Sequence, residues 1–154
     1  MITDPLGRLE AEHEVALAAL ERLEHAALEL GANGPPEMHL AVAREVHALL
    51  AGAVREHNES EERALFPLLG SDAPLGPFLE EHQTLWRLEE HLARAIERRE
   101  GAQVADVSLE IVDLLRAHIR RENEVLFPMA RAQLGPEGLA AVARELDSSP
   151  SGSM

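Results

Sequence analysis

Apolar residues recur every three to four positions along most of the chain, which is the spacing of an amphipathic α-helix. The first such pattern follows a clear start signal, with Thr3 or Asp4 as the N-cap and Pro5 at the first helical position. It lasts until the break at Gly31–Pro36. The apolar stripe of this helix also carries one polar residue, because His13 lies in line with Leu6, Leu9, Ala16, Leu20, Leu23, Ala27 and Leu30.

Three more stripes of the same period follow. The second covers residues 42–65, and we expect this helix to end near Phe66–Pro67, since a residue before proline disfavours the helical conformation. The third stripe covers residues 78–96 and the fourth residues 107–129. A segment rich in glycine and proline separates the second stripe from the third, Gly101 lies between the third and the fourth, and no alternating strand pattern competes.

These elements predict an all-α fold, an up-down-up-down antiparallel four-helix bundle with short loops. We assign residues 1–147 to this single domain, with a short C-terminal helix after Pro136, and expect residues 148–154 to be a disordered tail.

Composition narrows the function classes. The 28 acidic residues against 14 basic ones give a net charge of -14, which argues against nucleic acid as a partner and disfavours an anionic membrane surface. The lack of cysteine excludes disulfides, thiolate metal sites and thiol nucleophiles. No secretory signal and no apolar run of membrane-spanning length is visible, so we expect a cytoplasmic protein.

One short motif occurs twice. His57 and Glu61 lie four residues apart and are followed by Leu-Phe-Pro at 65–67; His118 and Glu122 are followed by Leu-Phe-Pro at 126–128. Residues four apart lie on the same face of a helix, so each copy presents an imidazole beside a carboxylate. Such pairs are suited to holding a metal ion, and two pairs indicate two ions or one bridged pair of ions.

Two more histidines are expected at the same level along the bundle axis as the two repeated motifs. In the predicted topology the first and third helices begin at the end where the second and fourth finish. At about 1.5 Å per residue, His13 and His82 then reach the same level as the two repeated motifs, within about a turn. The candidate metal ligands are therefore His13, His57, Glu61, His82, His118 and Glu122. The other histidines are rotated away or lie turns away, and we expect them at the surface: His25, His39, His47 and His91.

The alternative to metal binding is an ordinary buried histidine or ion pair. Taken alone, each candidate fits that interpretation better. Four histidines and two glutamates on apolar stripes at one depth would, however, cost several kcal/mol for each unpaired group. Imidazole and carboxylate without thiolate favour iron or manganese, with zinc as an alternative, and two shared carboxylates fit ions about 3.5–4 Å apart. The motif order is the reverse of the ferritin-like Glu-x-x-His, which disfavours that class.

The ligand set with both Leu-Phe-Pro continuations, over roughly residues 5–131, resembles the hemerythrin-like family, also called HHE cation-binding domains. The resemblance implies two non-haem iron ions with an oxo or hydroxo bridge, in a bundle that binds or senses O₂, NO or peroxide. By position, it implies that one iron is held by His13 and His57, the other by His82 and His118, and that Glu61 and Glu122 bridge them.

One position departs from the oxygen-carrying members, which have a fifth histidine one turn after the third-helix ligand. Here that position is Trp86, which cannot ligate a metal and which we expect in the core. Counting about six positions per iron, five are filled on each, so we expect both irons to keep an open position. Glu14 is rotated by about 100° from His13 and is a weak substitute ligand. Glu89 lies two turns beyond His82 on the same face; we expect it to be solvated, and the alternative is a position behind the ligands that supports them.

Sequence alone leaves the use of such a centre open. The favoured interpretation is ligand binding or sensing, and the alternative is a di-iron oxidoreductase or iron-handling protein that oxidises ferrous iron, removes peroxide or NO, or stores iron. The chain has no tyrosine or cysteine for radical or thiol relays, which weakens the enzymatic interpretation. Nothing in the pattern marks an oligomeric interface.

Overall fold

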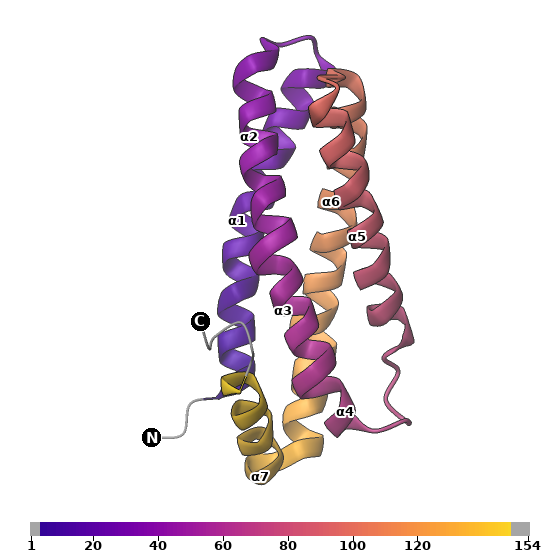
Figure 1. Cartoon of the computed structure of the whole chain (residues 1–154). Helices are drawn as coiled ribbons and strands as arrows, with labels where there is room; N and C mark the ends of the chain where they lie inside the picture. Colours follow the sequence, from indigo (N-terminus) through magenta and orange to yellow (C-terminus); the bar gives the residue numbers. More distant parts are fainter. Residues whose placement is uncertain (1–3, 149–154) are drawn as a thin grey trace.

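The computed structural model describes residues 4–148 as four long antiparallel helical segments, which confirms the predicted bundle (Figure 1). The first segment is α1 (Pro5–Gly31) and the third is α5 (Gly76–Glu97). The second and fourth are each interrupted by π-helical turns, labelled η. The second comprises α2 (Pro36–Leu49), η1 (Leu50–Val54), α3 (Arg55–Ser60), η2 (Glu61–Leu65) and α4 (Phe66–Leu69). The fourth comprises α6 (Gly101–Arg121), η3 (Glu122–Leu126) and α7 (Phe127–Asp147).

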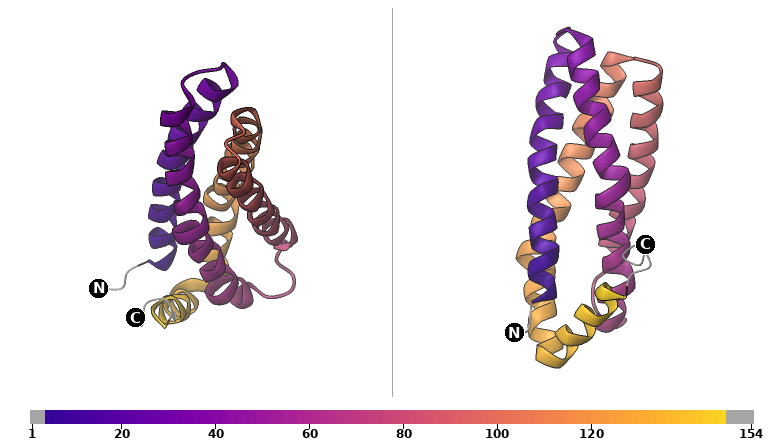
Figure 2. Two further views of the ribbon diagram at one scale, coloured as in Figure 1. Left: turned by 45° about the horizontal axis from the view of Figure 1, so that its top comes forward. Right: turned by 60° about the vertical axis from the view of Figure 1, so that its left-hand side comes forward.

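The segments form a closed ring. Helix α1 packs against α2 and α6, and α5 packs against α6 and α2, so the chain runs up, down, up and down as predicted (Figures 1 and 2). Helix α1 begins as expected, since the Asp4 side chain accepts a hydrogen bond from the Leu6 N–H at 3.1 Å and Pro5 follows as the first helical residue. Over residues 4–148, no helix has both the length and the apolar character needed to cross a bilayer.

The second and fourth segments continue through their Leu-Phe-Pro prolines. The expected end near Phe66–Pro67 is therefore wrong, because the helix extends to Leu69. A proline inside an α-helix removes one hydrogen bond and clashes with the carbonyl four residues earlier. Here a π-turn directly precedes each Phe-Pro pair, η2 before Pro67 and η3 before Pro128. In this widened turn a carbonyl accepts a hydrogen bond from the N–H five residues later rather than four. The proline nitrogen is then not needed as a donor, and its ring has more room beside the preceding turn.

The core consists of two apolar clusters separated by a polar layer. The larger cluster fills most of the bundle, and the smaller one closes the end where α1 begins. Along α1, Leu9 belongs to the smaller cluster and Ala16 to the larger one, with His13 between them. On the fourth segment, Glu122 separates Ile119 from Leu126 in the same way. The candidate ligands therefore lie between two apolar regions.

The C-terminal part of α7 closes this end of the molecule. Gly135 has a positive φ of 64°, which a glycine adopts without strain, and this kink together with Pro136 turns the chain across the bundle (Figure 2). Val142 and Leu146 are buried in the smaller cluster. The short C-terminal helix is thus confirmed. Of the predicted tail, Ser148 is the C-cap residue that follows α7, and residues 149–154 lie outside the described residues.

Candidate metal centre

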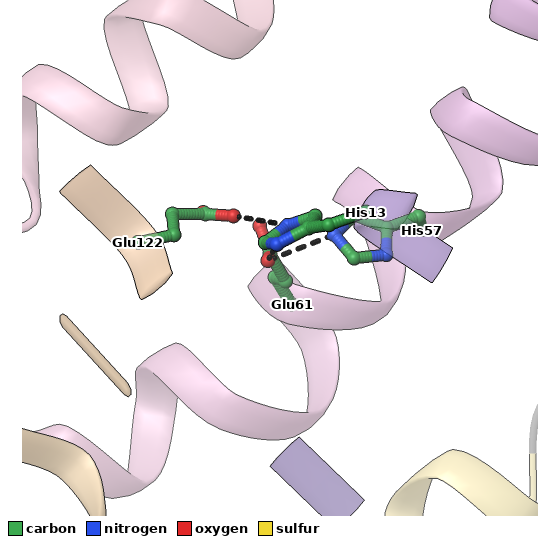
Figure 3. Close-up of side chains that lie close together, drawn as sticks. All are labelled: His13, His57, Glu61 and Glu122. Atoms are coloured by element: carbon green, nitrogen blue, oxygen red, sulfur yellow. Dashed lines mark hydrogen bonds and ion pairs between the residues drawn. The ribbon is translucent and has the colours of Figure 1, made fainter. Parts of the chain in front are cut away.

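All six predicted ligands are buried and lie together in one layer. They come from α1, α3, η2, α5, α6 and η3, and none is more than 8% exposed. Figure 3 shows four of them with their side chains directed toward one another. Both repeated glutamates are fully buried at the first residue of a π-turn, a feature common at functional sites.

The six side chains form two overlapping groups of four. In each group, one potential ligand atom from every residue lies within 4.8 Å of the others. Both groups contain Glu61 and Glu122. One group is completed by His13 and His57, and we call it subsite A; the other, subsite B, is completed by the remaining two histidines, His82 and His118.

Each glutamate directs one carboxylate oxygen into each subsite. Glu61 Oε2 lies 3.0 Å from His57 Nε2, while its Oε1 lies 3.3 Å from His82 Nε2. Glu122 Oε1 lies 2.9 Å from His13 Nε2, while its Oε2 lies 3.1 Å from His118 Nε2. A carboxylate with its oxygens divided in this way can contact two cations at once.

Several of these atoms lack a hydrogen-bond partner. Glu61 Oε1, Glu122 Oε2 and the Nε2 atoms of His82 and His118 are buried without one among residues 4–148, although the pairs lie within ion-pair distance. Buried polar groups left in this state cost about 1–3 kcal/mol each, and more when charged. A cation in each subsite would give all of these lone pairs a partner, so the residues fit a pair of metal ions.

The opposite nitrogen of each histidine is fixed by a partner outside the layer. The four Nδ1 atoms each lie 2.7 Å from an oxygen acceptor: Glu12 for His57, Asn123 for His13, Glu62 for His82 and Glu81 for His118. An Nδ1–H that donates outward leaves the Nε2 lone pair directed inward. This arrangement is the usual support of metal-bound histidine.

The repeated phenylalanines pack directly on ligand rings. Phe66 stacks on His82 with ring centroids 6.1 Å apart, and Phe127 stacks on His13 at 5.4 Å. Each Leu-Phe-Pro motif therefore covers a histidine from a different helix. These contacts hold the two rings in place and exclude water from the end of the layer.

Electrostatics distinguishes the two glutamates. Burial and the neighbouring Glu122 carboxylate raise the pKa of Glu61 well above its ordinary value. Burial acts on Glu122 in the same direction, but the neighbouring His118 and His13 side chains outweigh it and lower the pKa of Glu122. Without a cation, the layer therefore disfavours two ionised carboxylates side by side.

This shift predicts a pH dependence for the metal-free protein. Between the unfolded value of about 4.5 and its raised folded pKa, Glu61 holds a proton in the folded state that the unfolded chain has released. Its contribution to the free energy of unfolding is thus constant below that window and falls as pH rises through it, by up to about 1.4 kcal/mol per pH unit. In the presence of a chelator, the free energy of unfolding measured by urea denaturation should fall more steeply between pH 5 and 8 for the unaltered protein than for Glu61→Gln. Parallel curves, or an equal effect of the exposed control Glu59→Gln, would contradict the assignment.

Comparison with known protein families agrees with this geometry. Residues 3–130 match the family described as the Hemerythrin HHE cation binding domain. The chain belongs to this family. No curated protein matches the chain. The match covers the four-helix bundle and all six candidate ligands.

In this hemerythrin HHE domain, the surroundings of the fifth-histidine position differ from expectation. Trp86 is 53% exposed rather than packed in the core, and the Arg55 guanidinium lies 5.5 Å from its ring centroid. Glu89 is buried rather than solvated, because its carboxylate accepts a hydrogen bond from Arg55 at 2.8 Å. Burial raises the pKa of Glu89, and the arginine partly offsets this effect. Glu14 is exposed and takes no place in the layer.

The four other histidines of the HHE domain do not belong to the candidate metal centre. His25 and His91 are exposed as expected, and His47 is half-buried. The expectation for His39 is wrong, since it is buried and packs edge-to-face against His25, with ring centroids 6.1 Å apart.

Two cavities of the HHE domain reach the layer. One, of about 270 Å³, borders His13 and His57 of subsite A and also His118 of subsite B; its lining combines apolar residues such as Leu115 with charged ones such as Glu12. The other, of about 390 Å³, lies between α3 and α5 and borders His82 of subsite B, together with Trp86, Arg55 and Glu89. Each subsite therefore has space beside it for a small molecule.

Proposed function

We propose that this HHE domain is a non-haem di-iron protein that binds or senses a small ligand, namely O₂, NO or peroxide. The observation that carries the proposal is the pair of overlapping subsites with two shared glutamates. Subsite A would hold one iron and subsite B the other, with Glu61 and Glu122 bridging and an oxo or hydroxo group completing the bridge. When bound, the irons would supply electrons and coordination sites for the ligand.

The protein's own residues support this role in three ways. The four outer acceptors fix the tautomer and orientation of the histidines. Phe66 and Phe127 cover two of the rings and keep water from the layer at that end. The cavity beside subsite A gives a small molecule space next to His13 and His57, and apolar side chains such as Leu115 and Ile119 form part of its wall.

The position of Trp86 favours a vacant coordination position at subsite B as well. Its side chain is 53% exposed, the group of potential ligands found around subsite B among residues 4–148 contains only His82, His118 and the two shared glutamates, and a cavity borders both His82 and Trp86. With two histidines each, both irons would then keep a position for an added ligand.

Mixing the anaerobic ferrous protein with O₂ tests this function. We expect a new visible absorption band that forms with O₂ and disappears when O₂ is removed, over repeated cycles. The same protein carrying Glu124→Gln, an exposed change two residues from Glu122, should behave identically. Rapid consumption of excess Fe²⁺ or hydrogen peroxide would instead identify the alternative, a di-iron oxidoreductase or iron-handling protein. No spectral change and no turnover would contradict both.

A further inference from the structure

The two subsites are related by an internal pseudo-two-fold symmetry. The ligands correspond in pairs, since His13, His57 and Glu61 of one hairpin match His82, His118 and Glu122 of the other. The outer acceptors follow the same relation. Glu12 precedes His13 and binds His57, and Glu81 precedes His82 and binds His118.

The second pair of outer acceptors breaks this symmetry. The residue after Glu61 is Glu62, which accepts from His82 Nδ1, whereas the residue after Glu122 is Asn123, which accepts from His13 Nδ1; both distances are 2.7 Å. Subsite B is therefore supported by two carboxylates, and subsite A by one carboxylate and one neutral amide.

Neighbouring arginines do not cancel this difference in charge between the two subsites. Glu12 lies 3.8 Å from Arg8, and Glu81 pairs with Arg121, so the matched glutamates each have a cation nearby. Among the described residues, Glu62 has no arginine within ion-pair distance. One uncompensated negative charge thus supports subsite B alone, although Glu62 is 44% exposed and water screens part of it.

We propose that subsite B binds a divalent metal ion more tightly than subsite A and fills first, with Glu62 and Asn123 as the positioning residues that set the order. The inference rests on the proposed metal-binding function. A metal ion on Nε2 draws electron density from the imidazole, and a carboxylate acceptor at Nδ1 stabilises the resulting positive charge better than an amide does. Loss of such an outer partner typically weakens metal binding 10- to 100-fold, and the exposure of Glu62 places the expected difference near tenfold.

Crystals of the metal-free protein with one equivalent of Mn²⁺ test this order, because anomalous diffraction reports the occupancy of each subsite separately. For independent subsites that differ about tenfold in affinity, subsite B should hold about three quarters of the metal. Either Asn123→Asp or Glu62→Gln should bring the two occupancies close to equal. The double variant should reverse the preference, which a merely structural role of either residue would not do. Glu124→Gln, which removes one negative charge as Glu62→Gln does but at an exposed position, should leave the distribution unaltered.

The possible results separate the inference from the function on which it rests. Equal occupancy in the unaltered protein, a preference for subsite A, or variants that leave the distribution unchanged would overturn the inference while leaving the metal centre intact. Mn²⁺ at neither subsite, with iron also absent, would overturn both.

Discussion

Replacing Glu61 with alanine is expected to remove both metal ions, not one. Its Oε2 faces His57 and its Oε1 faces His82, so the substitution takes a donor from each subsite at once. Of the carboxylates that face both subsites, only Glu122 would then remain for two divalent cations in a buried layer, which is unfavourable at low dielectric. We expect iron content to fall from two per chain to well below one after desalting, and Glu122→Ala to behave in the same way.

Two comparisons make this result specific. His82→Ala removes a donor from subsite B alone, and should lower the content toward one iron per chain. Glu59→Ala, an exposed change on the same helical segment, should retain two. Circular dichroism would establish that each variant is folded. Two irons retained in Glu61→Ala, or the loss of only one, would exclude a shared bridging role for this residue.

Metal removal is expected to produce a large loss of thermal stability. An ion that binds only the folded state contributes about 4 kcal/mol when its free concentration is a thousand times its Kd. Two such ions contribute about 8 kcal/mol, and in a domain of this size each kcal/mol shifts the Tm by about 2–4 °C. A chelator should therefore lower the Tm by roughly 15–30 °C, as measured by calorimetry.

The matched control for chelation is the double variant Glu61→Ala/Glu122→Ala, which lacks both shared carboxylates. Chelator should leave its Tm unchanged, because no metal is present to remove. An unchanged Tm in the original protein would indicate that the buried layer is stable without a cation. That outcome would contradict the inference drawn from its unpaired Nε2 and carboxylate atoms.

The sequence predicted the layer well because helical geometry fixes it. The four-residue spacing of His57 and Glu61 sets their shared face, and a constant rise per residue sets their depth relative to His13. Neither inference needs the details of packing. The structure confirms that all six residues lie together and buried, and their role as metal ligands stays a prediction.

The supporting contacts were missed, although the sequence carried signals for them. Glu12 and Glu81 each precede a ligand histidine at corresponding positions, and the Leu-Phe-Pro repeat places Phe66 and Phe127 alike. Such repetition beyond the ligands marks residues that serve the same centre. The contacts themselves join different helices, and no local pattern states which partner each residue meets.

Tertiary contacts also explain the wrong predictions for single residues. Glu89 is buried because Arg55, on another helix, donates a hydrogen bond to its carboxylate. The same guanidinium lies over the ring of Trp86, which is exposed. The helix end near Pro67 was misplaced because the rule for proline assumes an α-helix, whereas a π-turn precedes this proline.

Anomalous diffraction at the iron absorption edge, from crystals of the iron-loaded protein, tests the central claim most directly. We predict two iron peaks about 3.5–4 Å apart in the buried layer, a separation typical of two-metal sites. One peak should lie against His13 and His57, the other against His82 and His118, with Glu61 and Glu122 contacting both. A single peak, iron elsewhere, or a layer that stays empty in iron-saturated crystals would contradict the account.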